Sequence, residues 1–90
     1  MVRSFVRHHV HDYPAWREVY DGAATMQAEN GVRAKAVFRE LDDPHTVIVT
    51  HDFDDADAAH AFFALPGLKE RMEAAGVDSE PEVWLAEMVD

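Results

Sequence analysis

The spacing of apolar residues along this chain changes repeatedly between two periods, and the order of these changes leaves few topologies open. Strand patterns occur over residues 2–11 and 32–40, where apolar and polar residues roughly alternate, over the β-branched run 46–53, and over residues 82–89. Helical spacing occupies the stretches between the first and second strands and between the third and fourth. The order β-α-β-β-α-β is typical of ferredoxin-like α+β folds, in which a four-stranded antiparallel sheet carries both helices on one face. We expect residues 1–90 to form a single domain.

Local signals support these boundaries. Asp12 is placed to cap the first helix, Pro14 is tolerated in its first turn, and Gly31 follows its end. Asp54 is the expected cap of the second helical region, which Pro66-Gly67 interrupts. We further expect the first and third strands to lie at the centre of the sheet and to run parallel to each other.

Apolar side chains occur on both faces of the expected sheet. Val47 and Val49 point to one face and Ile48 to the other, while Trp84 faces away from Leu85. An antiparallel sheet with one solvated face would alternate cleanly between apolar and polar residues. The chain has no further element to cover the second face. We therefore expect a second copy of the sheet to pack there, giving a two-fold homodimer with a barrel-like interior.

Composition excludes several classes of function. The chain has 8 basic and 18 acidic residues and a formal net charge of −10, so nucleic acids and anionic membranes are not expected partners. The absence of cysteine excludes disulfides, thiolate metal sites and a cysteine nucleophile. No secretory h-region and no 18-residue apolar run is present, so we expect a soluble cytoplasmic protein.

Three of the six histidines are expected to meet at one edge of the sheet. His9 and His11 are two residues apart on one strand and therefore share a face, and His51 lies near the end of the third strand. If the first and third strands are parallel neighbours, these three imidazoles converge. A His-x-His pair with a third histidine suits Zn²⁺, Cu²⁺ or Fe²⁺. A divalent transition metal held by His9, His11 and His51 is therefore one interpretation, and a metal-free strand end is the other.

The same region supports acid–base chemistry without a metal. A neutral imidazole in an apolar interior can act as a general base near pH 7, and His9 and His51 are the candidates. Arg7 would hold an enolate, carboxylate or phenolate oxygen, or would instead form a structural ion pair. His8 is expected to point toward the helices, where it packs or forms a hydrogen bond. The residues expected to contact a ligand are Phe5, Trp16, Tyr20, Val49 and Trp84.

Four segments carry a resemblance to a known superfamily. They are the run from His8 to Trp16 (HHVHDYPAW), the turn Asp42-Asp43-Pro44, the strand Val47 to Phe53 and the block Leu68 to Val77 (LKERMEAAGV). Together they resemble dimeric α+β barrel proteins, which include the antibiotic biosynthesis monooxygenases and small polyketide cyclases. The resemblance implies a ligand between sheet and helices or inside the barrel, and many members use no cofactor.

These observations lead to three functional hypotheses. The first is a homodimer that binds a small apolar or aromatic, polyketide-like molecule and acts as a cofactor-free cyclase, isomerase or monooxygenase. The second is a non-catalytic dimeric module that binds a ligand or serves as an accessory subunit. The third is the histidine-ligated metalloprotein described above.

Overall fold

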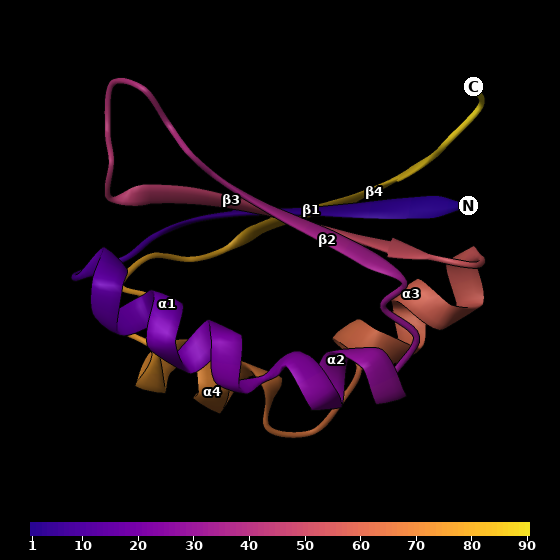
Figure 1. The fold of residues 1–90 in the computed structure, drawn as a ribbon, viewed down its shortest axis with the longest axis horizontal. Coiled ribbons are helices and arrows are strands. Elements are labelled where there is room, and N and C mark those ends of the chain that lie inside the picture. Colours follow the sequence, from indigo (N-terminus) through magenta and orange to yellow (C-terminus); the bar gives the residue numbers. More distant parts are fainter.

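A computed structural model describes all 90 residues of the chain. The elements, in chain order, are β1 (Val2–His9), α1 (Tyr13–Gly22), α2 (Ala24–Glu29), β2 (Ala34–Arg39), β3 (Thr46–Phe53), α3 (Ala56–Phe63), α4 (Leu68–Ala74) and β4 (Glu82–Glu87). All four helices lie on one face of the sheet, so the molecule has two layers (Figure 1). The ferredoxin-like α+β fold predicted from the sequence is confirmed. No helix is both long enough and apolar enough to cross a membrane.

The sheet has the strand order β2-β3-β1-β4, and every neighbouring pair is antiparallel. The central position of the first and third strands is confirmed, but their predicted parallel direction is wrong. Helices α1 and α2 carry the chain back across the sheet, so β2 runs in the direction of β1. The hairpin that follows reverses the chain again, and β3 therefore runs antiparallel to β1.

The helix boundaries follow capping chemistry, with two differences from expectation. Asp12 caps α1 as predicted, accepting a hydrogen bond from the Ala15 amide at 3.2 Å. The first helical region is divided, because α1 ends at Gly22 and α2 begins at Ala24. The second region is capped one residue later than predicted: Asp55 accepts from the Ala58 amide at 2.8 Å.

Asp54, the predicted cap, instead forms an ion pair with Arg33 at 2.9 Å. Its neighbour Asp55 has the extended backbone of an N-cap residue, which turns the side chain of Asp55 toward the free amides of the helix. Adjacent aspartates compete for this role, and the backbone conformation decides between them.

Alternate residues of β1 and β3 form the floor of the core. Val2 pairs with Phe53 and Val6 with Val49, and all four side chains are buried beneath the helices. Phe53 is fully buried and packs against Phe62 of α3 with ring centroids 5.5 Å apart. Burial of these apolar side chains is the main force that holds the helical layer on the sheet.

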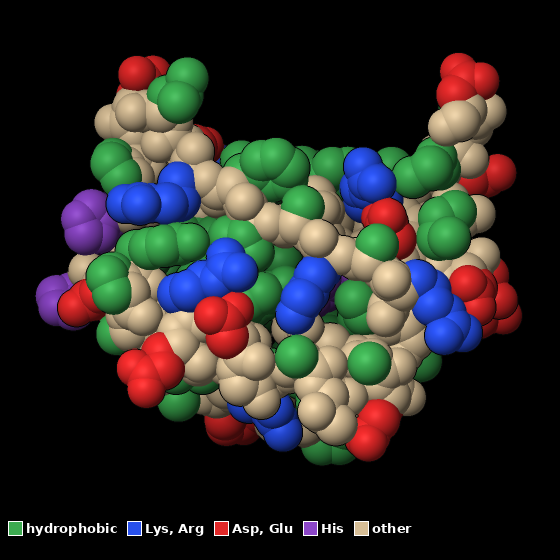
Figure 2. Space-filling view, in the orientation of Figure 1, with side chains coloured by type: hydrophobic (Ala, Val, Ile, Leu, Met, Phe, Trp, Pro, Cys, Tyr) green, Lys and Arg blue, Asp and Glu red, His purple; other side chains and the backbone are tan.

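The opposite face of the sheet, called the open face below, has no covering element. Phe5 of β1 and Trp84 of β4 stack there with centroids 5.3 Å apart, and Phe38 and Trp84 keep 53% and 45% of their surface exposed. The β2–β3 hairpin tip and the C-terminal tail rise beyond this face in Figure 1. Figure 2 shows hydrophobic side chains in the hollow between these two raised ends. Apolar residues therefore occupy both faces of the sheet, as the sequence predicts.

Replacing Phe53 by Ala should destabilise the fold by about 3–5 kcal/mol, because it leaves a cavity between the sheet and α3. Leu41→Ala in the hairpin is the control, since Leu41 is fully exposed. Urea unfolding monitored by circular dichroism measures both. A loss below about 1 kcal/mol for Phe53→Ala would contradict the assigned core.

Candidate functional site

A cavity of about 270 Å³ lies between the helices and the sheet. Residues from β1, β3 and all four helices line it, and 12 of the 17 lining residues are hydrophobic. Besides the Tyr20 hydroxyl, the polar side chains among them belong to His8, Gln27, His51 and Arg71. A mainly apolar cavity with a few polar groups is the usual form of a small-molecule site.

His51 reaches this cavity from β3, where the register with β1 directs it toward the helices. Its Nε2 atom lies 2.9 Å from the Tyr20 hydroxyl, and its Nδ1 atom is buried without a partner. Burial lowers the pKa of His51 to about 4, aided by the positive charge of Lys35 and opposed by Asp52. His51 is therefore neutral at pH 7.

The Tyr20 hydroxyl orients the His51 ring through its contact with Nε2. Beside Tyr20, Lys35 donates to the Gln27 side-chain oxygen at 3.0 Å. Burial raises the pKa of Tyr20 to about 12, opposed first by the positive charge of Arg17 and then by Gln27. Tyr20 thus keeps its proton and can donate it to Nε2 of His51. In that tautomer the Nδ1 atom of His51 carries a proton that is free to bind a ligand oxygen.

His8 presents a second buried imidazole to the same cavity. It keeps 6% of its surface exposed and packs against Trp16, with ring centroids 5.7 Å apart. Neither ring nitrogen has a hydrogen-bond partner, and burial lowers the pKa of His8 to about 4. A neutral imidazole offers one donor and one acceptor, so His8 can accept a proton from a bound molecule.

The residues predicted to form the site separate onto the two faces of the sheet. His51, Trp16, Tyr20 and Val49 line the cavity. The other predicted ligand contacts, Phe5 and Trp84, stack on each other on the open face. Trp16 and Tyr20 are also stacked, with centroids 4.9 Å apart, and they form one aromatic wall of the cavity.

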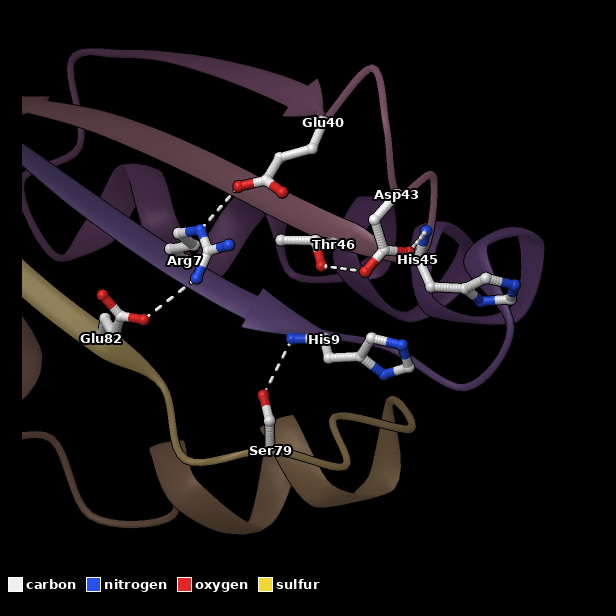
Figure 3. Close-up of polar contacts among 8 residues, drawn as sticks. All are labelled: Arg7, His9, Glu40, Asp43, His45, Thr46, Ser79 and Glu82. Carbon is white, nitrogen blue, oxygen red and sulfur yellow. Dashed lines mark hydrogen bonds and ion pairs between the residues drawn. The ribbon is translucent and has the colours of Figure 1, made fainter.

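Arg7 and His9 also lie on the open-face side of β1, opposite to the face that carries His51. Figure 3 shows the side chains that Arg7 and His9 contact. Arg7 donates to Glu40 at 2.7 Å and to Glu82 at 3.0 Å, so it has the structural ion pairs that the sequence offered as the alternative.

The predicted catalytic imidazole of His9 lies in a partly exposed cluster at the end of β1. Its Nδ1 atom contacts Asp78 at 2.5 Å, and its backbone amide donates to Ser79 at 2.8 Å. The ring stacks on His45 with centroids 5.6 Å apart. His9 is therefore not part of the cavity.

The expected convergence of His9, His11 and His51 is wrong. Because β1 and β3 are antiparallel, His9 pairs with Thr46 and His51 pairs with Ser4, at opposite ends of the two strands. His9 and His51 also lie on opposite faces, and no group of three or more His, Asp or Glu residues has the geometry to hold a metal ion.

Two of the residues that line the cavity, His8 and Gln27, were not identified from the sequence as functional residues. The predicted orientation of His8 toward the helices is confirmed, but the sequence indicates only packing or a hydrogen bond for its side chain. Gln27 carried no signal of its own. Its position two turns after Tyr20 on a helical face that is otherwise apolar was the available hint.

Comparisons with solved structures confirm the architecture. A mutant of SnoaB, a cofactor-independent oxygenase from Streptomyces nogalater, is similar to this chain with a TM-score of 0.77 and 25% sequence identity. The similarity covers 99% of this chain and 93% of the SnoaB chain. A structure from Bordetella bronchiseptica described as an antibiotic biosynthesis monooxygenase has a TM-score of 0.81 and 14% identity, over 98% and 96% of the two chains. One of the same description from Deinococcus radiodurans has a TM-score of 0.74 and 21% identity, over 100% and 94%.

No curated protein sequence gives a significant match. The family model described as antibiotic biosynthesis monooxygenase matches residues 13–74, the segment from α1 to the end of α4. This segment supplies most of the cavity wall, including Trp16, Tyr20 and His51. Because the match extends over more than half of the chain, the protein belongs to the antibiotic biosynthesis monooxygenase family.

Proposed function

We propose that the cavity binds a small aromatic molecule and that the protein oxygenates it without a cofactor. The observation that carries this proposal is the Nδ1 atom of His51, which is buried in an apolar cavity without a hydrogen-bond partner. Tyr20 orients the ring by its contact with the other nitrogen, Nε2. Membership of the family and the likeness to a cofactor-independent oxygenase support it. Cyclisation or isomerisation would begin with the same proton transfer and are the alternatives within this mechanism.

The two histidines can divide the acid–base work. A neutral His8 removes a proton from the substrate, and Nδ1–H of His51 donates to the oxygen on which negative charge develops. The low polarity of the cavity strengthens the attraction between the new imidazolium and the substrate anion, which compensates for the low pKa of His8.

The substrate must supply all the electrons, because no cofactor takes part in the proposed reaction. Conversion of an activated ring CH₂ to C=O consumes one O₂ and releases one H₂O, which balances atoms and electrons. The anion formed by proton removal reacts with O₂ and forms the new C–O bond. The apolar walls keep bulk water away from this anion.

His51→Gln should lower the rate of oxygen uptake at least 100-fold while changing ligand affinity less than tenfold. The bicyclic 2-tetralone is a suitable probe, since it has an acidified CH₂ group beside an aromatic ring. Uptake is followed with an oxygen electrode, and His60→Gln on the exposed side of α3 is the control. Binding without uptake in the unmodified protein would favour the non-catalytic module.

The free energy of unfolding should decrease as the pH is lowered from about 6.5 to 4. In this range the folded state keeps His8 and His51 neutral, while the unfolded state protonates them. The stability that depends on neutral His8 and His51 is fully present above pH 6.5. It is lost as the pH falls toward 4, by roughly 3 kcal/mol per histidine. Urea unfolding at several pH values measures this slope.

The double variant His8→Gln with His51→Gln should flatten the slope, and His60→Gln should leave it unchanged. The pKa values of Asp52 and Asp54 are lowered by arginine partners, so their effect appears only below about pH 4. An equal slope in the double variant would show that these imidazoles are not buried in the neutral form.

We also infer that the open face packs against a second copy of the chain. It combines the Phe5–Trp84 stack with the positively and negatively charged side chains of two ion pairs. Such a mixed surface can match a copy of itself around a two-fold axis. Leu41 on the hairpin tip is fully exposed, and Val89 on the C-terminal tail keeps 83% of its surface exposed. These raised ends could enclose the partner's edges (Figure 2).

Light scattering at several concentrations should therefore give twice the 10.2 kDa chain mass. The double variant Phe38→Glu with Trp84→Glu places two charges on the open face and should give a folded monomer. A monomer of the unmodified protein at 100 μM would refute the dimer.

A further inference from the structure

Helix α4 brings a positive charge to the cavity. Its side chains Leu68, Arg71 and Met72 belong to the cavity lining, yet no residue of this helix is buried. Arg71 is itself exposed, so it lies where the cavity meets solvent. A ligand bound among the aromatic side chains would reach this guanidinium with its outer end.

Arg71 is the one arginine of the chain without a hydrogen-bond or ion-pair partner. Arg3, Arg7, Arg17 and Arg33 each pair with a carboxylate, and Arg39 donates to the Pro44 carbonyl. The positions three and four residues from Arg71 along the helix are Gly67, Leu68, Ala74 and Ala75, none of which is charged. In a chain of net charge −10, an unpaired cation on the rim of a cavity stands out.

We propose that the ligand is an aromatic carboxylate whose ring system occupies the cavity and whose carboxylate binds Arg71. This inference rests on the proposed function and names the substrate class of the same site. The planar guanidinium matches a carboxylate with two parallel hydrogen bonds, and a single arginine balances a single negative charge. Inside the cavity, His8 and His51 remain available to the other oxygens of the ligand.

The size of the cavity suits a ligand of about two fused rings. An apolar cavity of about 150 Å³ is enough to bind benzene. The cavity here has about 270 Å³, somewhat less than twice that volume. The carboxylate itself lies outside this space, at the exposed guanidinium.

Arg71 also lies in the last turn of α4, where a positive charge stabilises the helix dipole. That role would make Arg71→Ala slightly less stable but would not let the protein distinguish a charged ligand from a neutral one. The test therefore compares two probes of nearly equal shape, 2-naphthoate and 2-naphthamide, by titration calorimetry at pH 7.5.

The unmodified protein should bind 2-naphthoate about tenfold more tightly than 2-naphthamide in 20 mM salt, and 200 mM salt should reduce this preference. Arg71→Ala should remove the preference and leave the affinity for 2-naphthamide unchanged, while Arg71→Lys should restore part of it. Lys69→Ala, on the same helix but outside the cavity lining, is the matched control and should preserve it.

Equal binding of the two probes, or an unchanged preference in Arg71→Ala, would overturn the carboxylate assignment while leaving the cavity as the ligand site. The variant Val19→Trp tests the cavity itself, because Val19 lines it and keeps 42% of its surface exposed. If Val19→Trp does not weaken binding of either probe, or neither probe binds the unmodified protein, then the proposed function fails together with this inference.

Discussion

The antiparallel register between β1 and β3 determines what each face of the sheet can do. Ser4 pairs with His51 and His8 with Val47, so both histidines enter the space beneath the helices. Side chains alternate with a period of two, and a shift of one residue would move every one of them to the other face. The buried pairs Val2–Phe53 and Val6–Val49 hold the register, because a shift would expose four apolar side chains. The site is thus a consequence of core packing.

Three unpartnered imidazole nitrogens in one apolar cavity oppose stability. Each such atom costs about 1–3 kcal/mol when it is buried away from water, and native proteins contain few of them. Replacing His8 and His51 by apolar residues would remove this cost. A bound molecule that supplies hydrogen bonds to these atoms removes this cost as well, and the free energy recovered adds to its affinity. The arrangement therefore fits a site that sacrifices stability to bind and activate a ligand.

Much of this structure follows from local signals that the sequence contains. The order of strands and helices, the Asp12 cap and the orientation of His8 toward the helices were all predicted from spacing. The strand direction was predicted wrongly, although counting the chain reversals through two helices and a hairpin gives the antiparallel answer. The expected convergence of His9 and His51 followed from this wrong strand direction.

Other features of the site depend on tertiary contacts that one sequence does not contain. Gln27 lines the cavity, and Lys35 on the following strand fixes the orientation of its amide. Arg71 is distinguished by the absence of a partner, and this absence is visible only when every other arginine has been placed. Sequence patterns identify which face a residue occupies, whereas charge pairing across elements must be read from the fold.

Strand β1 carries side chains on both faces of the sheet and links the cavity to the open face. Its residues alternate between the cavity, through Val6 and His8, and the open face, through Phe5 and Arg7. A second copy packed on the open face would hold Phe5 and Arg7 in place, and the same backbone would then fix His8. Positioning within about half an ångström is what acid–base catalysis requires of such a group. The proposed dimer on one face would thus contribute to the geometry of the cavity on the other, even though no open-face side chain lines the cavity.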